Sequence, residues 1–170
     1  MKAALAGRPR VRWLTAILMI AAANISHAAS TTTTFTASAV IVSSCTVTAT
    51  NLAFGTYTAT SATALAGTSV INVYCTSGTP STVALNIGTG GGTFATRDMA
   101  NSTYLMNYNL YTSVAHTTIW GDGTASTSTV AGTGAGVLTA SPNTVYGNIP
   151  ISQDLPPGTY SSTITVTVNY

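Results

Sequence analysis

The sequence predicts an all-β sandwich, and three observations support this prediction. Short segments in which apolar and polar residues alternate recur at intervals of about 8–12 residues, with turn residues between them. Many of these segments are rich in the β-branched residues that strands favour. From residue 29 onward, no window of 12 or more residues has the periodicity of a helix. Repeated alternation of this kind is typical of two antiparallel sheets packed face to face.

Residues 1–28 have the composition of a secretory signal peptide, which predicts export from the cytoplasm. An apolar run from Trp13 to Ala23 follows a basic start, and Ser26-His27-Ala28 places small residues at positions −3 and −1 of a cleavage site. A membrane anchor is the less favoured alternative, because the run is shorter than the roughly 20 residues that span a bilayer. Removal of 28 of the 170 residues leaves 142, enough for one domain. The basic residues of the leader are Lys2, Arg8, Arg10 and Arg12.

The chain after the leader carries almost no charge. Four of the five basic residues of the whole chain lie in the leader. The mature chain therefore keeps Arg97 against three aspartates, which gives it a formal charge of −2. Charged residues make up 5% of the whole chain, against about 25% in ordinary soluble proteins. So little surface charge suits a protein that assembles with other copies, and the lack of a basic patch argues against nucleic acid as a partner.

The first mature segment, Phe35 to Cys45, is predicted to be a strand. It contains no proline, glycine or charged residue, and its residues alternate between two sides. A long uncharged strand near a chain terminus exposes edges that pair readily with another chain. We therefore expect this strand to be donated to a neighbouring copy. The residues that share one side, called the donor set below, are Phe35, Ala37, Ala39 and Ile41.

Further segments with the same alternation are expected to form the rest of the sandwich. Glycine and proline clusters between them predict turns, and the low-complexity stretch Thr124–Gly136 is compatible with either a strand or a loop. In the last segment one side carries Ile164, Val166, Val168 and Tyr170, called the edge set below. The expected strands are Thr46–Thr50, Leu52–Tyr57, Thr68–Cys75, Ser81–Ile87, Tyr104–Tyr111, Val145–Ile151 and Tyr160–Tyr170.

The two cysteines, Cys45 and Cys75, are expected to form one disulfide, because an exported protein meets an oxidising compartment. Two buried free thiols are the alternative. The bridge would close a loop of about 30 residues and contribute about 3–4 kcal/mol. The spacing of the cysteines does not match a metal site, and no histidine cluster accompanies them.

Residues with catalytic chemistry are few, and the sequence predicts no enzyme. His116 is the only histidine after the leader, and no nucleophile motif accompanies it. The aspartates are scattered, and Asp98 is expected to pair with its neighbour Arg97. Trp120 lies among aromatic residues that form either a sugar-binding surface or, as we favour, part of the core.

Short motifs spread over nearly the whole mature chain occur together in one known family. They are Phe35–Cys45, Leu52–Tyr57, Ile71–Thr76, Ala95–Met99, Leu105–Tyr111, Ile119–Gly123, Val145–Pro150, Pro157–Tyr160 and Thr163–Tyr170. Each motif alone has little specificity, but the number of motifs and their order are specific. With them, the sequence resembles the spore coat protein U domain family, which includes the major pilin of archaic (Csu-type) chaperone–usher pili.

The resemblance implies an incomplete immunoglobulin-like sandwich that lacks its last strand. It implies a donor-strand extension over residues 29–44 and a pilin domain over 45–170, with the family's disulfide between Cys45 and Cys75. In that family the extension of one subunit fills the groove of the next, so the donor set would fill the pockets and the edge set would border them. Ala37 and Ala39 are smaller than the usual side chains, a loss on the order of 1–2 kcal/mol per site.

The function implied is a structural subunit of a secreted bacterial surface fibre, a pilus for surface attachment and biofilm formation. The implied partners are other copies or related pilus subunits, a periplasmic chaperone and an outer-membrane usher, with no cofactor. The fibre would be displayed at the cell surface after export through the periplasm. The alternatives are a spore or cell coat protein and a secreted binding module whose own N-terminal strand completes its sheet.

Overall fold

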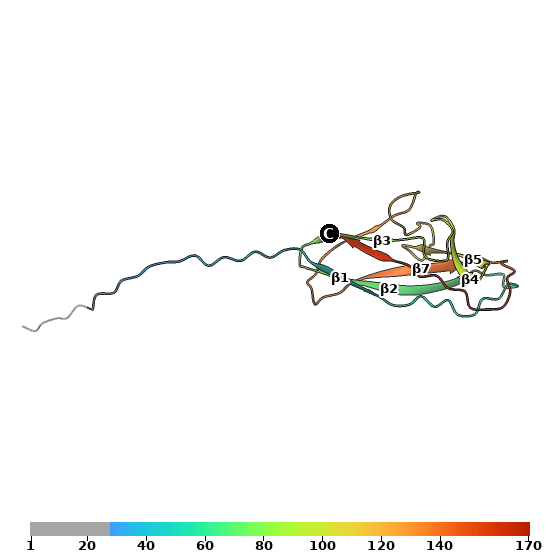
Figure 1. Ribbon diagram of the computed structural model, residues 1–170, viewed down its shortest axis with the longest axis horizontal. Coiled ribbons are helices and arrows are strands. Elements are labelled where there is room, and N and C mark those ends of the chain that lie inside the picture. The colour runs from blue at the N-terminus through green and yellow to red at the C-terminus, as the bar shows by residue number, and fades with distance from the viewer. Residues whose placement is uncertain (1–27) are drawn as a thin grey trace, which may run out of the picture. The chain divides into compact units, whose positions relative to one another are not determined.

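The computed structural model describes residues 28–170, and Figure 1 gives the order of their elements. The chain divides into two units, residues 1–39 and 40–170. Within the described part, eight strands occur and no helix is long and apolar enough to cross a membrane. The strands are β1 (Cys45–Ala49), β2 (Leu65–Cys75), β3 (Pro80–Leu85), β4 (Arg97–Asn101), β5 (Tyr104–Tyr111), β6 (Val130–Thr133), β7 (Ser141–Ile149) and β8 (Val166–Asn169).

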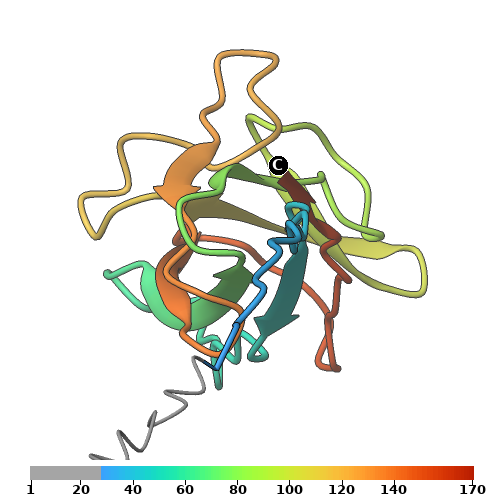
Figure 2. The same cartoon turned by 90° about the vertical axis from the view of Figure 1, so that its left-hand side faces the viewer.

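The strands form two antiparallel sheets, which confirms the predicted all-β sandwich. The larger sheet has the order β1-β2-β7-β5-β4, and the smaller has the order β6-β3-β8. In the larger sheet Cys45 pairs with Cys75, and Ile71 pairs with both Ala49 and Asn143. Figure 2 shows the sandwich turned by 90° from the view of Figure 1. An isolated bridge between Ala100 and Ser161 joins β4 to the segment before β8.

Alternation along the strands places one set of side chains between the two sheets. In β2 every second residue from Ser69 to Cys75 is buried, as the period of two requires. Trp120, in the loop between β5 and β6, is buried with 1% of its surface exposed, and its Nε1 donates to the carbonyl of Val83 at 2.9 Å. The buried core cluster consists of Ile71, Val73, Cys75, Val83, Leu85, Met99, Met106, Tyr108, Leu110, Trp120, Val145 and Ile149.

Most predicted strands are present, but the strand predicted over Leu52–Tyr57 is wrong. These residues belong to no ladder, and Gly55 has a φ of +82°, outside the range of a strand. A Cβ built on Gly147 would lie 2.6 Å from the side chains of both Leu52 and Phe54, so these two side chains pack directly on the backbone of β7. The segment thus covers the sheet. The undecided stretch Thr124–Gly136 contains the short strand β6.

The predicted pairing of Arg97 with Asp98 is also wrong. Within residues 28–170 no carboxylate contacts Arg97. Its guanidinium donates instead to the carbonyl oxygens of Asn86 and Trp120 and to the side-chain oxygen of Asn109. Neighbouring residues of a strand direct their side chains to opposite faces, which separates the two charged groups. Burial lowers the pKa of Arg97, and nearby Tyr108 partly offsets this effect.

Residues 28–39 form no helix or strand, and residues 40–44 precede the first strand. The strand predicted from Phe35 to Cys45 is therefore not formed in this single chain, and its pairing with a neighbouring copy stays a prediction. The side chains of Phe35 and Ile41 are 91% and 85% exposed, as expected for a segment without a partner. The predicted signal peptide lies almost wholly outside the described residues.

Candidate functional site

Two of the four outermost strands of the sandwich lie close to each other, and their open edges are the basis of the candidate site. β1 is one outermost strand of the larger sheet, opposite β4, and β8 is one outermost strand of the smaller sheet, opposite β6. The two strands approach each other, as Figure 2 shows with β1 in dark teal and β8 in dark red beside the C-terminus. An open edge carries unpaired N–H and C=O groups that a further strand can use.

The edge on the β8 side begins before β8 itself. The carbonyls of Thr163 and Thr165 accept from the N–H groups of Thr89 and Asn86, at 3.1 and 3.2 Å. Successive residues of a strand direct their backbone groups to opposite sides. The backbone groups of Ile164 and Val166 therefore point away from β3, toward the open side.

The edge on the β1 side has the same arrangement. The carbonyl of Ser44 accepts from Thr76 at 2.9 Å, and the N–H of Thr50 donates to Val70 at 3.0 Å. These bonds fix the phase of the ladder between β1 and β2. The backbone groups of Val47 and Ala49 consequently face away from β2, toward the open side.

A cavity of about 430 Å³ lies between the two edges. Buried residues of both sheets form its floor, so a strand placed there would extend the hydrophobic core. Ten of the sixteen lining residues are apolar, and the other six carry a hydroxyl or an amide group. The cavity together with its two edges is called the groove below. The lining residues are Ala49, Thr50, Asn51, Leu52, Phe54, Ser69, Ile71, Leu85, Met99, Tyr108, Leu110, Val145, Ser162, Thr163, Ile164 and Val166.

A second cavity of about 610 Å³ continues the first, because Leu52, Phe54 and Met99 line both. Its far wall is the loop after β7, which Gln153 fastens to β5. The N–H of Asn107 donates to Gln153 Oε1 at 2.7 Å, and Gln153 Nε2 donates to the carbonyl of Asn107 at 3.0 Å. The two cavities together thus extend past Leu52 and Phe54 to the loop after β7.

Of the edge set, Ile164 and Val166 line the groove, while Val168 packs against the core cluster and Tyr170 is 60% exposed. The role of this set as the border of the groove stays a prediction. Sequence reasoning missed the opposite wall, Leu52 and Phe54, because it assigned them to a strand. Gly55 was the signal that this segment leaves the sheet.

Tyr108 is the only ionisable side chain in the lining of the groove. Its ring meets that of Phe54 edge to face, with centroids 6.2 Å apart. Burial raises the pKa of Tyr108, and the hydroxyl of Ser162 partly offsets that rise. The phenol is therefore neutral at physiological pH, and the groove offers neither charge nor a general base in its lining.

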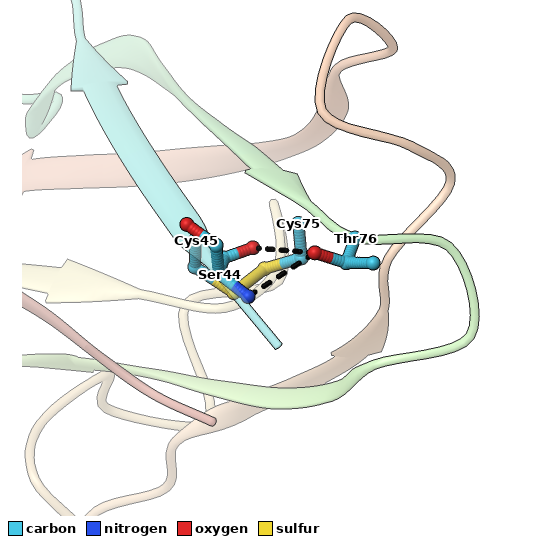
Figure 3. The surroundings of a disulfide bond; sticks show 4 residues. All are labelled: Ser44, Cys45, Cys75 and Thr76. Carbon is cyan, nitrogen blue, oxygen red and sulfur yellow. Dashed lines mark hydrogen bonds between the residues drawn. A yellow bond between two sulfur atoms is a disulfide. The ribbon is translucent and has the colours of Figure 1, made fainter. Parts of the chain in front are cut away.

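The disulfide between Cys45 and Cys75 is present, with a sulfur–sulfur distance of 1.99 Å. Figure 3 shows that Ser44 and Thr76 pair beside it: the N–H of Ser44 donates to Thr76 Oγ1 at 3.1 Å, and Thr76 Oγ1 donates to the carbonyl of Ser44 at 3.3 Å. The bridge joins the first residue of β1 to the last residue of β2. It thereby anchors the edge strand β1 at the point where the N-terminal segment ends.

The residues considered for other chemistry lie apart from the groove. Trp120 is in the core, so its ring is not available to stack on a sugar. His116 has a φ of +52° and packs against Tyr111, with ring centroids 5.0 Å apart. Within residues 28–170, no group of three or more histidine, cysteine or acidic side chains is arranged to hold a metal ion.

The fold and the groove define this chain as a β-sandwich with a groove between two neighbouring strand edges, those of β1 and β8. It belongs to the Spore Coat Protein U domain family, whose model matches residues 31–167. It is 34% identical over 115 residues to Protein U of Myxococcus xanthus, covering 62% of this chain and 61% of the relative. The chain thus spans about three fifths of the length of that relative.

A solved structure supports the fold. The chain matches, with a TM-score of 0.50 and 24% identity, a chain from the CsuC–CsuE chaperone–tip adhesion subunit pre-assembly complex of archaic chaperone–usher Csu pili of Acinetobacter baumannii. The match covers 76% of this chain and 40% of the solved chain.

Proposed function

We propose that this protein is a structural subunit of a secreted bacterial surface fibre, which polymerises when the N-terminal strand of one copy fills the groove of the next. The observation that carries the proposal is the groove between two unpaired strand edges in a protein that also has an exposed, uncharged, alternating segment at its N-terminus. The groove lacks a strand between its two edges, and the N-terminal segment is a strand-like sequence that lacks a sheet.

The backbone geometry favours this exchange. An added strand between β1 and β8 would hydrogen-bond to the backbone groups of Ile164 and Val166 on one side and of Val47 and Ala49 on the other. Such strand addition gains affinity from main-chain hydrogen bonds and specificity from alternate side chains. It would also convert β1 and β8 into internal strands, which removes the aggregation hazard of these two edges.

The donor set is apolar, like most residues that line the groove. The seven residues from Phe35 to Ile41 span roughly 23 Å in an extended strand, and a strand of that length would pass from the first cavity toward the second.

The proposal includes partners that the groove would need before assembly. An open apolar groove in a newly exported chain requires protection, and a periplasmic chaperone that lends a strand to the same edges would provide it. The solved relative is a chaperone–tip adhesion subunit complex before assembly of the pilus. An outer-membrane usher, display at the cell surface, and a role in attachment and biofilm formation complete the proposed function, which involves no catalysis.

The family name supports a second setting for the same mechanism. The family model is described as a Spore Coat Protein U domain, so strand exchange between copies would equally build a coat. The competing binding-module function needs the N-terminal strand to complete its own sheet and the chain to remain a monomer. Trp120, the residue on which that function depended, is buried.

Deletion of residues 29–43 tests the proposal. The shortened protein is expected to lose all polymers that resist SDS without heating, while it still co-purifies with the chaperone through its groove. A deletion of residues 29–33, which spares the donor set, is the matched control and should polymerise normally. Polymers of undiminished amount after the longer deletion would refute the proposal.

A further inference from the structure

Arg97 is the only lysine or arginine after the leader, and its side chain is fully buried at 0% exposure. Two of its guanidinium nitrogens, Nε and Nη2, donate to the carbonyl of Asn86 at 3.1 and 3.0 Å. A buried guanidinium is tolerated only where hydrogen bonds replace its lost hydration. These bonds therefore fix the position of the Asn86 backbone, just beyond the end of β3.

The guanidinium is itself held by the larger sheet. Nη1 of Arg97 donates to Asn109 Oδ1 on β5 at 2.6 Å, and Nη2 donates to the carbonyl of Trp120 at 2.7 Å. The amide of Asn109 in turn donates to the carbonyls of Phe94 and Ala95, at 2.9 and 2.8 Å. Arg97 thus connects the interior of the five-stranded sheet to the end of a strand in the three-stranded sheet.

The side chain of Asn86 then reaches the edge strand of the groove. Its Oδ1 accepts from the N–H of Thr165 at 2.9 Å and from that of Gly88 at 3.1 Å, while its own N–H donates to the carbonyl of Thr165 at 3.2 Å. Thr165 lies between Ile164 and Val166, whose backbone groups face the open edge. Asn86 therefore holds Thr165 by both of its backbone groups.

This arrangement replaces a strand ladder at the point where the ladder stops. The pairing of β3 with β8 ends at Leu85 and Val166, and the chain of β3 turns away after Asn86 toward the positive-φ residue Gly88. Without the side chain of Asn86, the N–H of Thr165 would lose its acceptor, and the segment before Val166 would be held by the backbone bond from Asn86 to Thr165 and by the bonds between Thr89 and Thr163. A loose edge orders only when a strand adds to it, and that ordering reduces affinity.

We propose that Arg97 and Asn86 are positioning residues for strand addition, which preorganise the edge at Ile164 and Val166 to receive the donor strand. The inference rests on the proposed function, because it assigns a role within the same groove. Arg97 acts through Asn86, and neither side chain lines the groove. The residues instead set the spacing of the backbone groups that an incoming strand must meet.

The test uses three variants of the full chain and measures how long assembled polymers survive in SDS at a fixed temperature. Asn86→Ala removes the acceptor and is expected to shorten the half-life of the polymers about tenfold, the effect of losing a hydrogen bond or two. Asn86→Asp keeps an oxygen acceptor and is expected to restore the half-life. Asn143→Ala, which removes only a local bond to Ser141 on β7, is the matched control.

Trypsin separates positioning from general stability. Arg97 is the only tryptic site after the leader and is buried, so cleavage there reports opening of the domain. We expect Asn86→Ala and Asn143→Ala monomers to be cleaved at similar rates, although their polymers differ. Equal half-lives of Asn86→Ala and wild-type polymers would overturn the inference, as would failure of Asn86→Asp to restore them. If the wild-type protein formed no SDS-resistant polymers, the proposed function would fail as well.

Discussion

The strands β2 and β8 have nearly the same kind of sequence but different surroundings. Both alternate β-branched apolar residues with polar ones. β2 lies between β1 and β7, and its inward residues Ile71 and Val73 are 2% and 3% exposed. β8 pairs only with β3, and its inward residues Val166 and Val168 are half-buried beside the groove.

The difference teaches that alternation predicts a strand but not how many neighbours it has. Every second side chain of β8 points toward the core, as in β2, but β8 has a neighbouring strand on one side only. The same distinction applies to Phe35–Ile41, where alternation without any partner leaves the segment outside every sheet. The predictions below change one side of this comparison at a time, from the largest expected effect to the smallest.

A charge on the inward side of the donor strand should abolish assembly. Ala39→Asp would place a carboxylate in the apolar groove, where an unpaired charge costs several kcal/mol. Ser38→Asp adds the same charge on the other side of the strand and should leave the amount of SDS-resistant polymer nearly unchanged. Comparable loss of polymer in both variants would mean that charge alone, and not the side that carries it, decides assembly.

Removal of the disulfide should destabilise the domain at its edge strand. Cys45→Ala combined with Cys75→Ala opens a loop of 30 residues, which should lower the free energy of unfolding by about 3–4 kcal/mol. Urea unfolding of the purified monomer measures the change. A decrease of less than about 1 kcal/mol would show that the unfolded chain gains little freedom from the loss of the bridge.

A methyl group at Gly147 should disturb the covered face of β7. The Cβ of Gly147→Ala would lie 2.6 Å from both Leu52 and Phe54, and such overpacking costs about 1–3 kcal/mol of unfolding free energy. Gly132→Ala on β6, where the nearest atom would be 3.8 Å away, is the matched control and should not destabilise the domain. Equal unfolding free energies of the two variants would contradict the close packing of Leu52 and Phe54 on β7.

Acid should weaken the turn at Asp122 slightly. Its carboxylate accepts from the hydroxyl of Thr124 at 2.6 Å and from its N–H at 2.9 Å, and these bonds lower the pKa of Asp122 below 3.8. Because the folded-state pKa is lowered, the ionised carboxylate stabilises the domain fully above the unfolded-state pKa, and this stabilisation is lost as the pH falls through the folded-state pKa. Asp122→Asn should therefore reduce the loss of thermal stability below about pH 4. An unchanged pH dependence would contradict this assignment.

Much of the fold was predictable because it depends on local patterns. Period-two alternation identified β2, β3 and β5, and the glycine and proline clusters between the segments predicted turns, such as those at Gly78 and Gly88, which have positive φ. The single disulfide followed from export and two cysteines.

The wall of the groove and its support were not predictable, since they depend on long-range contacts. Leu52 and Phe54 alternate like a strand, but Gly147, far away in the sequence, provides the surface on which they pack. Asp98 looked like the natural partner of Arg97, whereas the fold brings Asn86, Asn109 and Trp120 to the guanidinium. A carbonyl oxygen leaves no trace in a sequence pattern, because every residue has one.

The most direct test of strand exchange places a photoreactive phenylalanine analogue at position 35, a change that keeps the aromatic ring. Fibres are assembled from a mixture of isotopically light and heavy copies, illuminated and analysed by mass spectrometry. The account predicts cross-links between light and heavy copies, from position 35 to peptides that line the groove, such as those containing Phe54 or Ile164. Cross-links confined to single copies, or found only outside the groove, would contradict it.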